Sequence, residues 1–259
     1  MTTRTTAPTG APCWADLWTS DVEGARRFYD ELLGWEAGEP SPEFGGYFMF
    51  NRHGVPVAGG MGDMGDMPAQ NIWKIYLSTD DIGGVVKAAE AEGAQIVVPP
   101  SPVADLGTQA VLTDPTGAGV GVWQPGTFPG FTVLDEPGSP SWFELFTTDY
   151  TRALDFYRSV FGLLADTVSD SDDFRYSTLR RPDGREQLGG ILDARSILPG
   201  GGSYWTLYWE TTDVEATVSK LRSLGGSVSQ DATDTPYGRI AAVGDPYGAT
   251  FKLRQGPAA

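Results

Sequence analysis

Residues 14–21 of this chain read Trp-Ala-Asp-Leu-Trp-Thr-Ser-Asp, and residues 142–149 read Trp-Phe-Glu-Leu-Phe-Thr-Thr-Asp. The two stretches are 128 residues apart. A second match, at a spacing of 132 residues, relates the segment 73–81 to the segment 205–213, and an Asp-Pro-x-Gly turn follows in each half. Similarity that recurs at a nearly constant spacing indicates tandem copies of one structural unit. The chain is therefore expected to be a duplication.

Each half divides again into two similar quarters. Every quarter begins with an alternating strand, continues with an amphipathic helix and ends with short strands separated by turn residues. An Asp stands where each helix would need an N-cap, and a Gly stands just past its end, where a left-handed C-cap is favoured. These residues are Asp21, Asp81, Asp149 and Asp213 at the helix starts, with Gly34, Gly93, Gly162 and Gly225 at the ends. The pattern predicts an α+β fold of four βαβββ modules.

Composition indicates where the domains begin and end. A Pro- and Gly-rich run at residues 126–140 is typical of a linker. We expect an N-terminal tail at 1–12, a first domain at 13–125 with modules 13–65 and 71–125, and a second domain at 141–255 with modules 141–193 and 203–255. The loop from Met61 to Met67 joins the first two modules, either as a solvated connection or as a lid over the first domain.

The charge of the chain excludes several classes of partner. The formal net charge is -16, which would repel the phosphates of nucleic acids and the surface of anionic membranes. No stretch approaches the roughly 18 apolar residues that span a bilayer, and the first residues have no apolar core of a signal peptide. A single cysteine, Cys13, cannot form an internal disulfide. These features predict a cytoplasmic protein without a nucleic-acid or membrane partner.

The helix starts of the form D-[VI]-x-x-[AV], the Phe-Tyr pairs followed by LLGW or VFGL, and the DPxG turns resemble the glyoxalase, bleomycin-resistance and extradiol-dioxygenase superfamily, also called vicinal oxygen chelate proteins. The resemblance extends from Cys13 to Arg254, and it is closest to two-domain glyoxalase-like proteins of actinobacteria, often labelled hydroxylases. It implies that paired modules form curved mixed sheets, or cups, and that ligands bind inside them.

The resemblance also implies where metal ligands would stand. The first ligand position of the superfamily corresponds to Trp14 and Trp142, and the last corresponds to Gly121 and Lys252. None of these side chains is an imidazole, carboxylate or thiolate, the groups that bind divalent transition metals. The only histidine, His53, lies in a predicted hairpin turn. We therefore expect no metal ion and no other cofactor.

Strand alternation predicts which side chains face the cups. Trp14, Asp16 and Trp18 share one face of the first strand, and Trp142, Glu144 and Phe146 share the equivalent face in the second half. The same reasoning assigns aromatic residues of the later strands to the cups. The predicted ligand-binding residues are Trp14, Trp18, Trp73, Trp123, Trp142, Phe146, Trp205, Trp209 and Arg239.

Three charged side chains are candidates for chemistry. Asp16 and Glu144 would be desolvated among indoles, which favours their protonated forms and suits them to acid–base catalysis; alternatively, each accepts hydrogen bonds and orders its strand. Lys252 could polarise a carbonyl or enolate in place of a metal, or could simply extend its ammonium to solvent. Because Gly121 has no charge, the second cup, which also contains Arg239, is the better candidate for activity.

The leading hypothesis is a metal-independent enzyme, resembling an isomerase, lyase or hydroxylase, that acts on a hydrophobic oxygenated aromatic or polyketide-like metabolite of secondary metabolism. Its step would be an isomerisation, cyclisation, epimerisation or hydration. The alternative is a non-catalytic protein that sequesters an antibiotic, as in bleomycin resistance. Either hypothesis requires a small hydrophobic or aromatic partner, and the chain could function as a monomer or a homodimer.

Overall fold

Two eight-stranded mixed sheets form the protein, and each is built by one half of the chain. The computed structural model describes residues 2–63, 68–198 and 200–257. The first sheet has the order β3 (Glu36–Ala37), β4 (Phe48–Arg52), β5 (Val55–Met61), β2 (Pro12–Trp18), β6 (Ile72–Ser78), β9 (Gly119–Pro125), β8 (Gly107–Thr113) and β7 (Gln95–Val103). The second has the order β12 (Leu164–Asp170), β13 (Arg175–Arg180), β14 (Gln187–Asp193), β11 (Pro140–Thr147), β15 (Tyr204–Glu210), β18 (Thr250–Gln255), β17 (Gly238–Gly244) and β16 (Ser227–Thr235).

The first strands of paired modules join each sheet at its centre. Strand β2 runs antiparallel to β6 and parallel to β5, while β11 runs antiparallel to β15 and parallel to β14. Both sheets remain open, with β3 and β7 as the edges of one and β12 and β16 as the edges of the other. The predicted α+β fold of four βαβββ modules in two glyoxalase-like domains is confirmed.

The four α-helices among the described residues begin at the predicted Asp N-caps. They are α1 (Val22–Leu33), α2 (Ile82–Ala91), α3 (Tyr150–Phe161) and α4 (Val214–Ser223), with a short 3-10 helix η1 (Pro42–Phe44) after β3. Helices α1 and α3 end at the predicted C-caps Gly34 and Gly162, whereas α2 and α4 have the C-caps Glu92 and Leu224, one residue before Gly93 and Gly225. Each of the four predicted Asp residues accepts a hydrogen bond from a backbone amide in the first turn. Gly34 and Gly162 have φ values of 70° and 67°, a conformation that residues with a Cβ rarely adopt.

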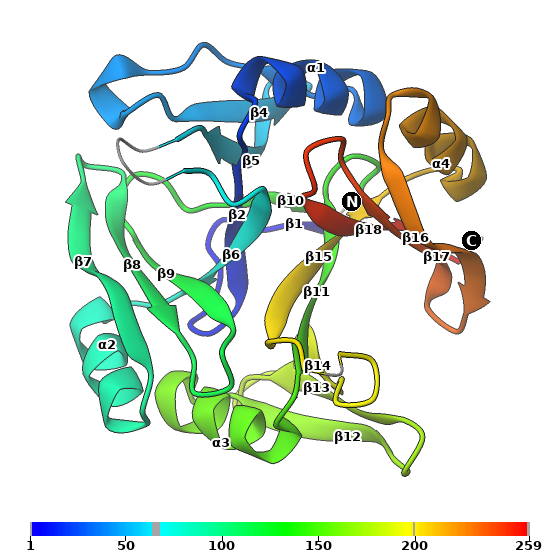
Figure 1. Ribbon diagram of the computed structural model, residues 1–259. Helices are drawn as coiled ribbons and strands as arrows, with labels where there is room; N and C mark the ends of the chain where they lie inside the picture. The colour runs from blue at the N-terminus through cyan, green and yellow to red at the C-terminus, as the bar shows by residue number, and fades with distance from the viewer. Residues whose placement is uncertain (1, 64–67, 199, 258–259) are drawn as a thin grey trace.

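Helices from the two halves lie side by side in two pairs. Helix α1 lies beside α4 and α2 beside α3, above and below the strands in Figure 1. Two hydrogen-bond relays connect the halves: the Trp73 indole donates to Tyr29 of α1 at 3.1 Å, and Tyr29 donates to Asp245 at 3.1 Å. Trp205, Tyr157 and Asp114 repeat this arrangement in the opposite direction. The Phe-Tyr and DPxG motifs thus stabilise the contact between halves.

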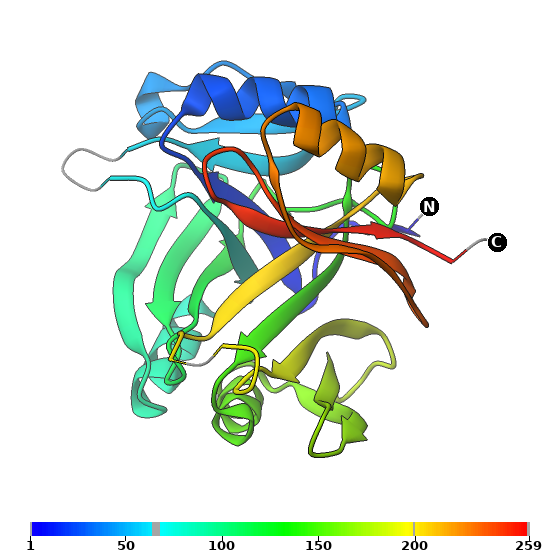
Figure 2. The same ribbon diagram turned by 45° about the vertical axis from the view of Figure 1, so that its right-hand side comes forward.

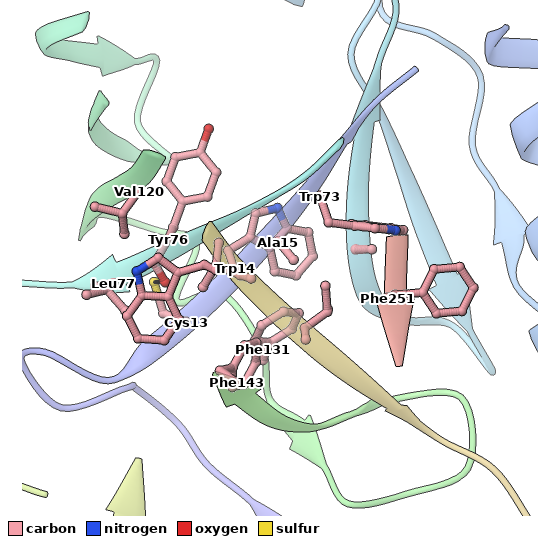
Figure 3. Packing of buried hydrophobic residues seen from close by; sticks show 14 of the residues in the cluster. Cys13, Trp14, Ala15, Trp73, Tyr76, Leu77, Val120, Phe131, Phe143 and Phe251 are labelled. Atoms are coloured by element: carbon pink, nitrogen blue, oxygen red, sulfur yellow. Dashed lines mark hydrogen bonds between the residues drawn. The ribbon is translucent and has the colours of Figure 1, made fainter. Parts of the chain in front are cut away.

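The core between the sheets is rich in aromatic side chains. Trp35 and Trp209 are both fully buried, and their ring centroids are 4.7 Å apart. The Trp35 indole also donates to the carbonyl of Gly138 at 2.8 Å. Figure 3 shows Trp73 extending toward Phe251, a residue of the other sheet. The two halves therefore share one continuous hydrophobic core.

The N-terminal segment and the linker pack against the domains. Strand β1 (Thr2–Thr3) pairs with β10 (Val133–Leu134) of the linker, and the Arg4 guanidinium donates to the carbonyl oxygens of Phe131 and Pro12. Part of the loop expected as a lid, residues 64–67, lies outside the described residues.

Candidate functional site

An ion pair lies at the floor of the second cup. Lys252 of β18 donates to Glu144 Oε2 of β11 at 2.9 Å and to the Tyr208 hydroxyl of β15 at 2.7 Å. Tyr208 donates to the same carboxylate oxygen at 2.7 Å. Trp142 lies opposite Tyr208 on the adjacent strand, and Tyr208 lies opposite Lys252 on the next. Opposite residues of paired strands project from the same face of a sheet, and this register brings the cluster together.

The charged side chains of the cluster are largely buried. The side chains of Lys252 and Glu144 are 18% and 8% exposed, and the ammonium lies 4.5 Å from the ring centroid of Phe146. Burial is the main cause that raises the pKa of Tyr208, and the negative charge of Glu144 adds to it. Tyr208 therefore stays protonated at neutral pH and acts as a hydrogen-bond donor.

A cavity of about 940 Å³ opens above this floor. Trp142, Glu144, Tyr208 and Lys252 line its base, while side chains such as Ile240 contribute apolar wall. The volume lies near the upper end of small-molecule sites, which range from about 300 to 1,000 Å³. The cavity is therefore large enough for a ligand of several fused rings.

The first cup contains a related cluster in a different environment. The indole of Trp14 and the hydroxyl of Tyr47 donate to Asp16 Oδ1 at 2.9 and 2.7 Å. The ring of Tyr76 lies against Gly121, so that a Cβ at this glycine would be 2.2 Å from a ring carbon. No side chain equivalent to Lys252 can therefore stand on this strand without displacing the tyrosine.

Aromatic residues of the linker pack against this first cluster. The ring centroid of Phe128 lies 4.8 Å from that of Trp14, and Phe131 lies 5.0 Å from it. The Trp123 indole, on the same face of the sheet, donates to the carbonyl of Phe128 at 3.0 Å. These contacts cover part of the concave face around Asp16 with protein side chains.

We expect Asp16→Asn to change how the free energy of unfolding depends on pH. Burial raises the pKa of Asp16 above its usual value of 3.8. As the pH rises from this value to the folded-state pKa, the unfolded chain releases the proton first, and the wild-type protein loses stability. The asparagine variant lacks this loss, so its stability relative to wild type should increase as the pH rises above 3.8, the usual pKa of the carboxyl group. Urea unfolding across this range measures the difference, and a difference independent of pH would contradict the expectation.

The structure places the predicted ligand-binding residues in three groups. Trp142 lines the cavity, whereas Phe146 lies outside the lining, with its ring centroid 4.5 Å from the Lys252 ammonium. Trp14, Trp18 and Trp123 lie on the cup face of the first sheet, where the Trp18 indole donates to the carbonyl of Gly62. The remaining four, Trp73, Trp205, Trp209 and Arg239, lie elsewhere.

The placement of Trp73, Trp205 and Trp209 in the cups is corrected by the strand register. Asp16 pairs with Lys74, which places Trp73 on the opposite face of β6, against α1. The equivalent register turns Trp205 and Trp209 into the core between the sheets. Each of these strands has one wholly apolar face, which packs in the core, and one face with polar groups such as Lys74 or Tyr208, which lines the cup; the prediction assumed the reverse. Arg239 also points away from the cavity, where it pairs with Glu215 of α4 and with Asp234.

Four tyrosines around the carboxylates were missed by the sequence reasoning. Tyr47 donates a hydrogen bond to Asp16, and Tyr208 donates one to Glu144. Tyr76 lies close enough to Asp16 to offset part of the rise in pKa that burial causes, and Glu144 lies close enough to Tyr176 to add to the rise that burial causes in the pKa of that phenol. A signal existed for one of each pair, because Tyr76 and Tyr208 are 132 residues apart, at the spacing of the repeat. The wrong choice of face on β6 and β15 concealed it.

The residues at the second cup do not fit a divalent metal ion. The cluster has a single carboxylate, that of Glu144, and the Lys252 ammonium already donates a hydrogen bond to one of its oxygens at 2.9 Å. A cation would be repelled by Lys252 and would find no imidazole or thiolate beside it. Across the described residues, no group of three or more His, Cys, Asp and Glu side chains is arranged to bind a metal.

The family model described as the Glyoxalase/Bleomycin resistance protein/Dioxygenase superfamily matches residues 13–122 and 139–253. The chain belongs to this superfamily. Each half of the duplication carries one match, in agreement with the two separate sheets. None of the helices among the described residues is both long enough and apolar enough to cross a membrane.

Two named relatives are similar over nearly their whole length. Mycobacterium bovis CFP32, whose name describes it as a glyoxylase, is 35% identical over 251 residues, which is 94% of each chain. The anthracycline biosynthesis protein DnrV of Streptomyces peucetius is 37% identical over 272 residues, or 96% of each chain. Both relatives come from actinobacteria, as the sequence resemblance implied.

Solved structures share the fold at low sequence identity. The manganese-bound glyoxalase of Novosphingobium aromaticivorans has a TM-score of 0.66 at 15% identity, with 96% of this chain and 82% of that chain covered. The 2,3-dioxygenase LapB of Pseudomonas sp. KL28 has a TM-score of 0.63 at 15% identity, with 97% and 94% covered. At this level of identity, the two structures show that the arrangement of the modules, and thus the fold, is shared.

Proposed function

We propose that the second cup binds a hydrophobic, oxygenated aromatic or polyketide-like metabolite and catalyses a proton shift on it without a metal ion. Glu144 moves the proton, and Lys252 and Tyr208 donate hydrogen bonds to the oxygen that gains negative charge. The observation that carries this proposal is the buried Lys252–Glu144 pair at the base of a cavity of about 940 Å³.

The proposed step begins with a carbon–hydrogen bond next to a carbonyl group of the ligand. The Glu144 carboxylate takes the proton, and the electron pair moves to the carbonyl oxygen, forming an enolate. Lys252 and Tyr208 stabilise this oxygen, as preorganised donors do in a water-poor site. Return of the proton to another carbon, or to the other face, completes an isomerisation or epimerisation with no redox change. The enolate is also the nucleophile that a cyclisation would require.

The relatives support the class of ligand. Two streptomycete proteins, 37% and 36% identical to this chain, are named for anthracycline biosynthesis. Anthracyclines are planar, oxygenated polyketides, and their size suits the cavity. A role in secondary metabolism follows from this part of the proposal.

Sequestration without chemistry is the second candidate. It is favoured by the hydrogen bonds that Glu144 already accepts from Lys252 and Tyr208 at Oε2, because a carboxylate in a complete network also serves as a structural acceptor. Such a protein would bind the aromatic ligand and release it unchanged.

Deuterium exchange tests the catalytic proposal. A 1-tetralone with hydroxyl groups on its aromatic ring has methylene protons directly next to its carbonyl group, and NMR follows their replacement in heavy water. We expect the protein to accelerate this exchange and Glu144→Gln to reduce the acceleration by about 100-fold or more. Binding of a dihydroxyanthraquinone, followed by tryptophan fluorescence, should change by less than about threefold, since glutamine still accepts hydrogen bonds.

The matched control is Asp16→Asn, the equivalent change in the first cup. It should leave exchange and binding unchanged. If Asp16→Asn loses the exchange activity and Glu144→Gln keeps it, the first cup is the catalytic one and the proposal for the second cup is wrong. Binding without any acceleration by the wild-type protein would reject catalysis of this proton shift and favour sequestration.

A further inference from the structure

Two exposed aromatic side chains stand at the mouth of the second cup. Phe174 lies in the turn between β12 and β13, and Tyr237 lies in the turn between β16 and β17. They are 48% and 57% exposed, yet both line the cavity. The two hairpins form opposite edges of the second sheet, visible at the bottom and the right of Figure 1 and on the right of Figure 2. The curvature of the sheet thus brings both turns to one cavity.

Phe174 continues an aromatic wall that rises from the floor. Its ring is stacked on Tyr176, with the centroids 5.8 Å apart and an angle of 13° between the planes. Tyr176 in turn accepts a hydrogen bond from the Trp142 indole at 3.1 Å. Hydrogen bonds between Ser171 and the backbone of Phe174 hold the turn. This wall presents flat ring faces from the base of the cavity to its mouth.

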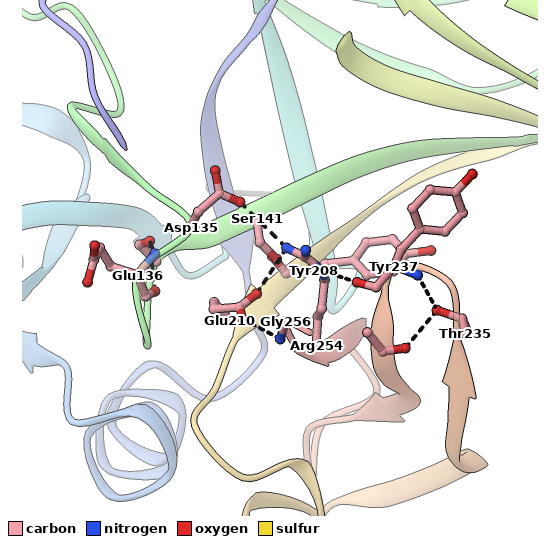
Figure 4. A network of polar contacts seen from close by, with 11 residues as sticks. Asp135, Glu136, Ser141, Tyr208, Glu210, Thr235, Tyr237, Arg254 and Gly256 are labelled. Atoms are coloured by element: carbon pink, nitrogen blue, oxygen red, sulfur yellow. Dashed lines mark hydrogen bonds and ion pairs between the residues drawn. The ribbon is translucent and has the colours of Figure 1, made fainter. Parts of the chain in front are cut away.

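Tyr237 is positioned by a polar network, shown in Figure 4. Its backbone carbonyl accepts a hydrogen bond from Arg254 Nε at 2.8 Å, and its amide donates to Thr235 Oγ1 at 3.2 Å. Arg254 is itself held by Glu210 at 3.2 Å and Asp135 at 3.5 Å. Tyr237 and Tyr176 both line the cavity, and they belong to hairpins at opposite edges of the sheet. Tyr237 therefore stands across the cavity from the wall formed by Phe174 and Tyr176.

The first half lacks both aromatic side chains at the equivalent positions. Gly45 stands two residues before Tyr47, as Phe174 stands two residues before Tyr176. Leu106 precedes Gly107 at the other turn, as Tyr237 precedes Gly238, and the Leu106 carbonyl accepts hydrogen bonds from the amides of the linker. The aromatic pair is thus specific to the half that contains the open cavity.

We propose that Phe174 and Tyr237 clamp the flat outer rings of a multi-ring ligand whose oxygenated inner end meets Lys252. This inference rests on the proposed function and specifies its ligand as a planar molecule of several fused rings. Stacked aromatic faces favour such a molecule over a single ring, because only a ligand long enough to reach the mouth contacts both side chains. Because the polar network already fixes the backbone of Tyr237, this backbone loses little conformational entropy when the ligand binds.

Calorimetric titration with two probes tests the clamp. One probe is a dihydroxyanthraquinone, with three fused rings, and the other is 2-hydroxyacetophenone, with one ring and a comparable carbonyl and hydroxyl. Phe174→Leu and Tyr237→Leu should each weaken anthraquinone binding by about five- to tenfold, and the double variant by roughly 30-fold or more. Binding of the single-ring probe should remain within about twofold of wild type.

Two further variants serve as controls. Tyr237→Phe keeps the ring and should bind the anthraquinone as wild type does. Phe44→Ala removes a 39% exposed aromatic residue near the corresponding turn of the first half and should have no effect. Unchanged anthraquinone binding in both leucine variants, or equal losses for the two probes, would overturn the clamp while leaving the proposed function intact. If the wild-type protein binds neither probe, the clamp and the proposed function are both overturned.

Discussion

Lys252→Met is expected to lower the free energy of unfolding by about 3 kcal/mol at neutral pH. The Lys252 ammonium is 2.9 Å from Glu144 Oε2, and both side chains are largely buried. Methionine is also unbranched and can still cover the ring of Phe146, so the variant mainly removes a charge. The carboxylate then remains buried without its counter-charge, which costs far more than the loss of an exposed ion pair.

The pairing of the two charges is tested by a double-mutant cycle. Adding Glu144→Gln to Lys252→Met should recover most of the lost stability, because the uncompensated carboxylate is gone. Urea unfolding of wild type, both single variants and the double variant gives the coupling energy. A double variant as unstable as Lys252→Met would attribute the loss to packing.

Trp35→Ala is expected to lower the free energy of unfolding by about 3–5 kcal/mol. The indole is fully buried, and it contacts Trp209 from the other half and the ring of Tyr29. Its removal leaves a cavity between the two sheets and leaves the Gly138 carbonyl without the indole donor. Because the halves share this core, the variant should also reduce the cooperativity with which the two halves unfold.

Trp35→Phe provides the matched comparison. It retains an aromatic ring but removes the hydrogen bond to Gly138, so a smaller loss of about 1–2 kcal/mol is expected. Urea unfolding followed by both tryptophan fluorescence and far-ultraviolet circular dichroism compares the transitions. Divergence of the two probes in Trp35→Ala would indicate that the halves unfold separately. A midpoint equal to wild type in Trp35→Ala would contradict the importance of this contact.

The local features of the fold were predictable because they depend on neighbouring residues. An N-cap such as Asp21 needs only the backbone amides that follow it, and the C-cap Gly34 needs only freedom from a Cβ. The repeat then extended these local features over the whole chain. The motif residues Tyr29 and Asp245 were also visible in the sequence, although their contact across the halves was not.

The prediction of which side chains face the cups was right for the first strand of each half and wrong for β6 and β15. Asp16 and Glu144 are acidic residues in otherwise apolar strands, and both lie on the cup faces. On β6, Lys74 and Tyr76 share one face and Trp73 lies on the other, and the antiparallel register with β2 decided which of these faces the cup. A register depends on contacts between distant segments, so alternation along one strand could not supply it.

The two cups differ in the residues at equivalent positions and in the contacts that the tertiary structure makes around them. The sequence alone showed that Gly121 and Lys252 differ at equivalent positions. Only the tertiary structure placed Phe128 of the linker against Trp14 and joined Lys252 to Glu144. Such contacts join residues that are 108 or more positions apart in the chain.

The amino-acid sequence by itself determined the duplication, the helix starts and the superfamily, and the resemblance predicted that Trp14, Trp142, Gly121 and Lys252 stand at the family's ligand positions. These properties follow from residue identity and short-range spacing. The tertiary structure decided which cup contains the described cavity and which tyrosines surround each carboxylate. It also brought Phe174 and Tyr237 to one mouth. Those outcomes require sheet register and curvature, which arise only when strands far apart in the chain pair with one another.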